Sequence, residues 1–380
     1  MKRMRTGEKA ATPMVLIGNA ASCPDFVYAT GFQAPDDAVF VRAGREFMIV
    51  SGLEFGRAQR VGGERGIEAL TPETLKLKGA RRREMSEWIV RLLKRERVGV
   101  VMVPRNFPYA AGKRIEKAGI RVKVAAGPLF PERARKNADE LRQIKQSQQA
   151  AVIATRGAIE MIARSEIDGA GFLRLGGKLL TSEAVRREIG RVLLEHDAFC
   201  REIIVAGGPQ SADPHEQGSG PLRAHEPIVL DIFPQNLSHG YWGDITRTVV
   251  RGSASPRLRR MYHAVKAAHA AALGRVRAGV RASSVHRSAA EALKRRGFKT
   301  GEENGRPVGF IHGTGHGVGL AVHERPSVSV NSDRLQTGNV ITIEPGLYYP
   351  EVGGIRIEDT VVVTPAGWKY LVPCEKRFEI

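Results

Sequence analysis

Short apolar runs and amphipathic stretches alternate along the first third of the chain. The runs have the length and residue types of strands, and the stretches between them repeat apolar residues at helical spacing. The predicted strands are residues 14–17, 38–42, 46–51, 98–103 and 122–125, and the predicted helices are residues 83–95 and 110–118. Strands alternating with helices in this way predict an α/β domain with a layered sheet.

The segment GPLFP at residues 127–131 ends this pattern, and a long helical stretch follows at about 137–163. Prolines interrupt regular structure, so we place a domain boundary here, between residues 1–131 and 132–380. A length of 380 residues also favours two domains. Beyond the boundary, the predicted helices are 182–196, 256–277 and 284–296, and the predicted strands are 228–233, 246–250, 340–343 and 360–363.

Two pairs of acidic residues stand within the predicted strands of the C-terminal part. In PIVLDIFPQNLSHGYWGDITRTVV, Asp231 and Asp244 lie on the two arms of a predicted hairpin. In GNVITIEPGLYYPEVGGIRIEDTVVV, Glu344 closes one apolar run and Glu358 opens the next. Carboxylates buried in apolar strands lose their hydration, which costs free energy unless a positive charge compensates for it. A pair of divalent cations would compensate all four, and oxygen ligands suit hard or borderline ions such as Mn²⁺.

The stretch FIHGTGHGVGLAVHERP carries three closely spaced histidines, His312, His316 and His323. Its glycines allow the backbone to come close to a buried site, and an imidazole would add a nitrogen ligand to the carboxylates. Any one such acid or histidine is more often a turn, cap or core residue. The prediction of a metal site therefore depends on the two acid-bearing hairpins and the histidines together.

These motifs, in this order, resemble the pita-bread metallopeptidases, which include aminopeptidase P, prolidase and methionine aminopeptidase. The resemblance covers about residues 136–380, through Asp231, GDITRT, HGTGHGVGLAVHE, TIEPGLY and GIRIED. The N-terminal part resembles the creatinase-like domain that precedes the catalytic domain in Xaa-Pro members. The resemblance implies an α+β fold, with a C-terminal pita-bread catalytic domain after a smaller α/β creatinase-like domain.

The resemblance also implies a role for each matching residue. Two divalent metal ions would be held by Asp231, Asp244, His316, Glu344 and Glu358. Mn²⁺ is the expected ion, with Co²⁺ or Zn²⁺ as alternatives. Glu344 would take the proton of the attacking water, and His215 and His323 would be the other catalytic groups. His312 and Arg356 would bind substrate on the proline side.

His312, Arg356 and the large N-terminal domain favour the Xaa-Pro branch of the family. We therefore expect hydrolysis of the bond between an N-terminal residue and a following proline, by an Xaa-Pro aminopeptidase or dipeptidase acting on small peptides. A homodimer is expected, as is usual among relatives. The alternatives are a methionine aminopeptidase-like enzyme and a non-catalytic pita-bread binding protein.

The chain departs from the family pattern between its two aspartates. Asp231 and Asp244 are thirteen positions apart, two more than is usual in the family, and DIFP stands where Asp-x-Gly-Ala is common. An even-numbered extension of a hairpin keeps both side chains on one face of the pleat. Metal ligation should therefore survive, whereas the shape of the substrate pocket is expected to change.

The net charge of +19 is the unusual bulk property of the sequence. Basic clusters at 81–83, 133–136, 257–260 and 294–296 lie within or beside helical patterns and lack interleaved aromatic residues. We interpret them as solvated helix faces, and nucleic-acid binding is the less favoured alternative. No apolar run is long enough to span a membrane, and Cys23, Cys200 and Cys374 form no CxxC pair, so a soluble cytoplasmic protein is expected.

Overall fold

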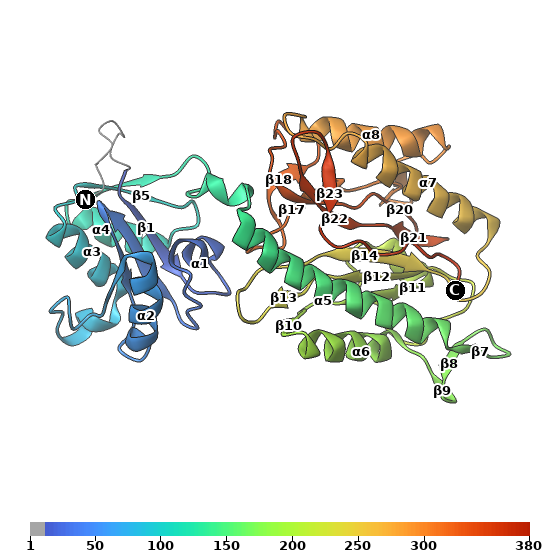
Figure 1. The fold of residues 1–380 in the computed structure, drawn as a ribbon, viewed down its shortest axis with the longest axis horizontal. Helices are drawn as coiled ribbons and strands as arrows, with labels where there is room; N and C mark the ends of the chain where they lie inside the picture. The colour runs from blue at the N-terminus through green and yellow to red at the C-terminus, as the bar shows by residue number, and fades with distance from the viewer. Residues whose placement is uncertain (1–11) are drawn as a thin grey trace. The chain divides into compact units, whose positions relative to one another are not determined.

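Two compact units make up the described part of the chain, residues 12–380 of this computed structural model (Figure 1). The first unit ends at Arg133 and the second begins at Ala134, within the short 3₁₀ helix η2 (Pro131–Ala134). The first eleven residues of the predicted N-terminal domain lie outside the described range. Among residues 12–380, no helix combines the length and the apolar character needed to cross a lipid bilayer.

A mixed six-stranded sheet forms the centre of the first unit, in the order β4-β3-β2-β1-β5-β6. The β1–β2 and β2–β3 pairs are antiparallel and the other three are parallel. The strands are β1 (Met14–Gly18), β2 (Ala38–Ala43), β3 (Arg45–Ile49), β4 (Ile67–Leu70), β5 (Val100–Val103) and β6 (Arg121–Val124). The helices are α1 (Pro24–Thr30), α2 (Phe55–Arg65), η1 (Gly79–Arg83), α3 (Met85–Arg95) and α4 (Tyr109–Lys117). The predicted α/β domain is confirmed.

Successive residues of β1 face opposite sides of this sheet, as the two-residue period of a strand requires. Val15 belongs to the core that contains Leu92 of α3, and Leu16 belongs to the core that contains Phe26 of α1. The sequence analysis did not predict α1, α2 or β4. Helix α2 contains three glycines, which lower helix propensity, so burial of residues such as Ala58 stabilises it instead.

Antiparallel strands form the centre of the second unit. One sheet has the order β11-β12-β14 and a second has the order β18-β17-β19-β22-β23, while β20 pairs with β21. These strands are β11 (Ile204–Gly207), β12 (Ile228–Ile232), β14 (Ile245–Val249), β17 (Gly315–Gly317), β18 (Glu324–Val328), β19 (Val340–Ile343), β20 (Gly346–Tyr349), β21 (Gly353–Arg356), β22 (Asp359–Val363) and β23 (Trp368–Tyr370). The shorter elements are β7 (Glu166–Ile167), β8 (Leu173–Leu175), β9 (Lys178–Leu179), β10 (Ala198–Phe199), η3 (Gly208–Ala212), β13 (Gln235–Asn236), β15 (Gly301–Glu303) and β16 (Arg306–Val308).

Two helix pairs cover these strands from opposite sides, and both are visible in Figure 1. Helices α5 (Ala138–Ala163) and α6 (Ser182–Glu195) share a core with β11, β12 and β14. Helices α7 (Pro256–Leu273) and α8 (Ala282–Arg295) share a core with β19 to β22. Helix α5 begins with a capping box in which Asn137 and Glu140 each bond the other's backbone amide.

The two helix pairs repeat one burial pattern. Buried residues 182, 185, 189, 192 and 193 of α6 recur in α8 at an offset of 100, as residues 282, 285, 289, 292 and 293. Buried residues 148, 151, 152, 154, 155, 158, 159 and 162 of α5 recur in α7 at an offset of 110. Each helix pair and its hairpin are therefore two versions of one structural unit.

Gly243, two residues before β14, lies directly against the backbone of α5. A Cβ atom at this position would lie 2.6 Å from the backbone N of Gln148 and the backbone C of Ser147. Gly243→Ala should destabilise the protein by about 1 to 3 kcal/mol, because helix backbone cannot move aside cheaply. Urea denaturation followed by circular dichroism measures the change.

Gly157→Ala is the matched control within α5. A Cβ atom at this position meets nothing within 4 Å outside its own helix. The control should raise stability by up to about 1 kcal/mol through helix propensity. Equal effects of the two substitutions would contradict the close-approach argument.

Candidate metal centre

Three side chains from three different strand regions offer ligand atoms within 4.8 Å of one another: Asp244, His316 and Glu358. Asp244 directly precedes β14, His316 is the middle residue of β17, and Glu358 directly precedes β22. The backbone amide of Glu358 donates to the carbonyl of Thr246 at 3.1 Å, which joins the second hairpin to the first. The fold thus brings residues from both halves of the repeat to one point.

His316 presents one ring nitrogen to the acids. Its Nδ1 lies 3.2 Å from the Gly317 carbonyl oxygen, which can only accept, so Nδ1 carries a proton. Its Nε2 lies 3.2 Å from Glu344 Oε1 and 3.6 Å from Asp244 Oδ2. Nε2 is therefore the nitrogen available for a metal ion, with its orientation fixed from the opposite side of the ring.

Asp231 lies next to this cluster and is held by two other side chains. Its Oδ2 accepts from Arg356 Nη2 at 2.7 Å, and its Oδ1 lies 2.9 Å from Thr246 Oγ1. The same hydroxyl lies 2.7 Å from Glu358 Oε2. Thr246 thus links Asp231 to Glu358, and His316 Nε2 lies near both Glu344 and Asp244. All five ligands predicted from the sequence belong to one of these two groups.

Burial makes this group of acids electrostatically unfavourable without a cation. Burial, and then the charge of neighbouring carboxylates, raises the pKa of Asp244 and of Glu358 well above the ordinary values. Burial also favours a raised pKa for Glu344, but the hydrogen bond from His316 outweighs it and lowers the value to about 2. Burial disfavours the charged form of His316, but its hydrogen bond to Glu344 outweighs burial and raises the pKa of His316 to about 9.

The donor set fits a divalent metal ion. Glu358 Oε1 is buried and lacks a hydrogen-bond partner among residues 12–380. A buried acceptor of this kind is costly unless something positive approaches it, and a cation would also relieve the repulsion between the acids. Carboxylate oxygens together with one imidazole nitrogen suit hard or borderline divalent ions.

A cavity of about 1040 Å³ opens in front of these acids. The other predicted site residues line this cavity: His215, His312, His323 and Arg356. Apolar side chains in its wall are those of Ile204, Phe233, Ile311 and Val322. The His316 and His323 rings meet edge to face, with centroids 4.3 Å apart. All nine predicted site residues therefore border one cavity.

Tyr348 is a site residue to which the sequence analysis gave no role. Its hydroxyl accepts from Arg356 Nη1 at 2.8 Å and lies 2.9 Å from His312 Nε2. His312 Nδ1 lies 2.7 Å from the Gly313 carbonyl, so Nε2 accepts and the tyrosine donates. Burial raises the pKa of Tyr348 to about 12, which keeps the phenol protonated at neutral pH. Its position inside the TIEPGLY motif was the available signal.

Gln148 is a second residue that sequence reasoning missed. Its side chain accepts from the Asp244 amide at 2.8 Å and donates to the Asp244 carbonyl at 2.9 Å. The amide side chain thus serves Asp244 as a neighbouring strand would. Because α5 and β14 are far apart in the chain, no local pattern indicates this pairing.

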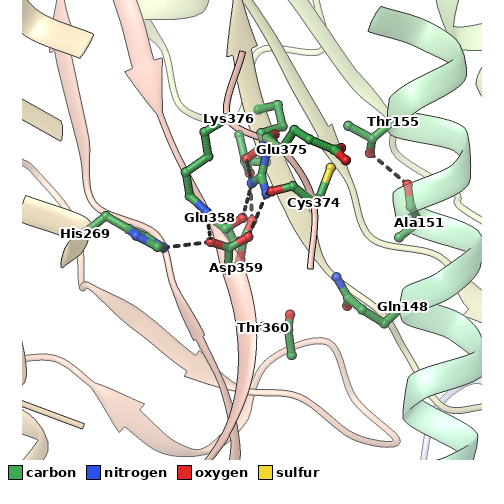
Figure 2. Close-up of polar contacts among 12 residues, drawn as sticks. Gln148, Ala151, Thr155, His269, Glu358, Asp359, Thr360, Cys374, Glu375 and Lys376 are labelled. Atoms are coloured by element: carbon green, nitrogen blue, oxygen red, sulfur yellow. Dashed lines mark hydrogen bonds and ion pairs between the residues drawn. The ribbon is translucent and has the colours of Figure 1, made fainter. Parts of the chain in front are cut away.

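A buried cluster of opposite charges lies beside Glu358, centred on Asp359 (Figure 2). Arg247 Nη2 donates to Asp359 Oδ1 at 2.7 Å and to the Cys374 carbonyl at 2.8 Å. His269 Nε2 lies 3.2 Å from Asp359 Oδ2, and Lys376 pairs with the same oxygen. Arg247 also donates to the backbone carbonyl of Glu358. The cluster therefore fixes the backbone that carries a candidate ligand.

Asp359→Asn tests this buried cluster. Removing the carboxylate charge leaves buried Arg247 without its anion, so the substitution should destabilise the protein by about 3 kcal/mol or more. Glu375→Gln is the matched control, because Glu375 pairs with Arg156 at 3.0 Å on the exposed surface. That pair should contribute less than about 1 kcal/mol. Similar urea unfolding midpoints for both variants would contradict the buried-pair interpretation.

The chain belongs to metallopeptidase family M24, whose model matches residues 142–365. The structure has the pita-bread fold of that family, as predicted, and resembles solved prolidases. The chain is 39% identical over 185 residues to a Xaa-Pro dipeptidase of Pyrococcus furiosus, a match that covers 48% of this chain and 50% of that protein. The chain thus spans about half the length of the curated relatives it matches.

Two solved structures are similar over almost the whole chain. The prolidase from Pyrococcus furiosus has a TM-score of 0.76 and 25% identity, covering 96% of this chain and 97% of that one. The Xaa-Pro dipeptidase from Bacillus anthracis has a TM-score of 0.80 and 22% identity, covering 96% and 94%. At that identity, the second likeness concerns the fold alone.

Proposed function

We propose that this chain is a metal-dependent peptidase that hydrolyses the bond between an N-terminal residue and a following proline. The observation that carries the proposal is the convergence of Asp244, His316 and Glu358 at the cavity, with a buried Glu358 oxygen lacking a partner among residues 12–380. The similarity to a Xaa-Pro dipeptidase and to a prolidase supports the choice of substrate.

The proposed ligands of two divalent ions, with Mn²⁺ as the expected metal, are Asp231, Asp244, His316, Glu344 and Glu358. Bound ions of this kind polarise a carbonyl and lower the pKa of water. Asp231 would have to share its carboxylate with Arg356, which already bonds one of its oxygens. Arg356 and Thr246 therefore set the orientation in which that carboxylate is presented.

The chain's own residues divide the remaining chemistry. Glu344, itself one of the proposed ligands, is also proposed to accept the proton of the attacking water, since its carboxylate borders the cavity. His323 lines the same cavity, and burial lowers its pKa, so at neutral pH it is a neutral group that can donate to an oxyanion or accept a proton. His215 also lines the cavity and is proposed as a second residue that hydrogen-bonds or exchanges a proton with the reacting groups.

The proline side of the cavity is proposed to lie at His312 and Arg356. Arg356 donates to Thr246, Tyr348 and Asp231, so it acts on substrate by holding those groups in place. Proline lacks a backbone N–H, so a site for Xaa-Pro bonds needs no acceptor for that hydrogen. Cavity shape would then select proline, and Phe233, in the unusual DIFP segment, lies in its wall.

Metal removal tests the proposed activity directly. Chelation should abolish hydrolysis of Xaa-Pro peptides, and Mn²⁺ should restore it.

Asp244→Ala should lower kcat/KM by about a thousandfold or more because it removes a ligand. Asp36→Ala, an exposed acid in the first unit, should change nothing. Full activity after chelation, or preferred cleavage of Met-Ala peptides, would reject the proposal. Comparing Xaa-Pro dipeptides with longer peptides assigns the enzyme as dipeptidase or aminopeptidase.

Tyr348→Phe tests the hydrogen-bonded chain from Asp231 through Arg356 to His312. Losing a hydrogen bond to a charged group should lower kcat/KM about tenfold or more, with metal content unchanged. Tyr349→Phe is the matched control, because its hydroxyl bonds the Lys299 carbonyl. Equal activity of the two variants would show that Tyr348 does not order the site.

A further inference from the structure

Positive charge is concentrated in one helical layer of the second unit. We define the basic layer as α7, α8, the connection between them and the residues directly after α8, residues 256–299. It contains twelve Lys and Arg residues and a single acid, Glu291, so it carries +11 of the chain's net +19. The layer includes two of the four basic clusters noted in the sequence, 257–260 and 294–296.

The α5–α6 pair is an internal control for this charge, because it performs the same packing role at equivalent buried positions. Helices α5 and α6 each contain three basic and three acidic residues. By contrast, α7 has four basic residues and no acid, and α8 has three and one. Covering a hairpin therefore does not require the excess charge.

Individual exposed positions show the same difference. At the offset of 110, the exposed Arg259 of α7 corresponds to the exposed Gln149 of α5. At the offset of 100, the run Lys294-Arg295-Arg296 corresponds to Leu194-Glu195-His196. The buried faces agree while the solvent faces differ, so the charge is a property of the surface alone.

Few of these cations are neutralised by neighbours. Within the described residues, ion pairs reach three of the twelve: Arg257 with Glu351, Arg259 with Glu379, and Arg295 with Glu291. In the α5–α6 pair, by contrast, ion pairs within the described residues reach four of the six basic residues, as in Arg191 with Glu188 and Glu195. Unneutralised charges crowded on one face repel one another, and an anionic partner would relieve that repulsion.

The chemistry of the surface selects among anionic partners. None of the exposed large hydrophobic residues of the described chain lies in the basic layer. A membrane-surface helix, a protein interface and a single-strand site would each present apolar or aromatic side chains. Nine of the twelve cations are arginines, whose planar guanidinium matches phosphate. At about 1.5 Å per residue, α7 is long enough to follow several phosphates of a duplex.

We propose that the outer face of the basic layer binds the phosphate backbone of duplex nucleic acid, without reading its sequence. This proposal differs from the interpretation favoured on the sequence alone, in which the basic clusters are solvated helix faces. The surface lies outside the metal centre and uses none of its residues, so the proposal stands independently of the peptidase function.

The test measures binding of a fluorescein-labelled 20-base-pair DNA duplex to the full chain by anisotropy, over a series of salt concentrations. The test variant replaces Arg260, Lys266, Arg287 and Lys294 with Gln; these are exposed helix residues without an ion pair among residues 12–380. The control replaces Arg142, Lys145, Arg187 and Arg191 on α5 and α6, which removes the same formal charge.

The wild type should bind with a steep salt dependence. The test variant should bind at least about tenfold more weakly, with a slope of log K against log salt reduced by about 0.9 for each lost phosphate contact. The control should bind as the wild type does, and both variants should keep the wild-type circular dichroism spectrum and metal-dependent peptidase activity. Equal losses in both variants would overturn the proposal. So would absence of wild-type binding at low salt, or tighter binding to vesicles of anionic lipid or to single-stranded DNA of the same length.

Discussion

The burial of carboxylates inside two apolar hairpins is the constraint on which the second unit depends. Asp244, Glu358 and Asp359 are almost wholly buried, and each needs a positive partner to remain charged. The protein meets this need in two ways. Asp359 receives Arg247, His269 and Lys376 from within the chain, whereas Asp244 and Glu358 lie together with His316 in the wall of the cavity. The first arrangement neutralises its acid with residues of the chain, and the second offers a donor set that suits a divalent cation.

The two hairpins must also be held in register for these acids to meet. Threonine hydroxyls on β14 make this connection where no continuous ladder joins the sheets. Thr248 Oγ1 donates to the Arg356 carbonyl at 2.9 Å and accepts from the Arg356 amide at 3.0 Å, as a strand backbone would. Thr246 provides a carbonyl for the Glu358 amide and a hydroxyl between Asp231 and Glu358. A β-branched residue suited to a strand thus also fixes the geometry of the site.

The sequence allowed the candidate ligands to be predicted because acids in β-prone runs conflict with local preference. Helices α5, α6, α7 and α8 were likewise predicted, as residues 137–163, 182–196, 256–277 and 284–296. Their partners across space could not be predicted. Gln148 bonds Asp244 over 96 positions, and Arg247 bonds Asp359 over 112, with no local signature at either end. Tyr348 stood within a recognised motif, yet its role follows only from its contacts with Arg356 and His312.

The overall charge of the chain has a different origin from the charges of the site. Around the hairpins, acids and bases are mutually compensated or positioned for a cation, so the interior adds little to the net +19. The repeat then separates packing from surface chemistry: equivalent buried positions in α5–α6 and α7–α8 preserve one fold, and the solvent faces are free to differ. Because packing leaves those faces unconstrained, a one-sided excess of arginine on α7–α8 is more readily explained by a partner than by stability. Because the buried and solvent-facing positions of the helices vary independently, the motifs that define the metal centre carry no information about the outer face of the basic layer.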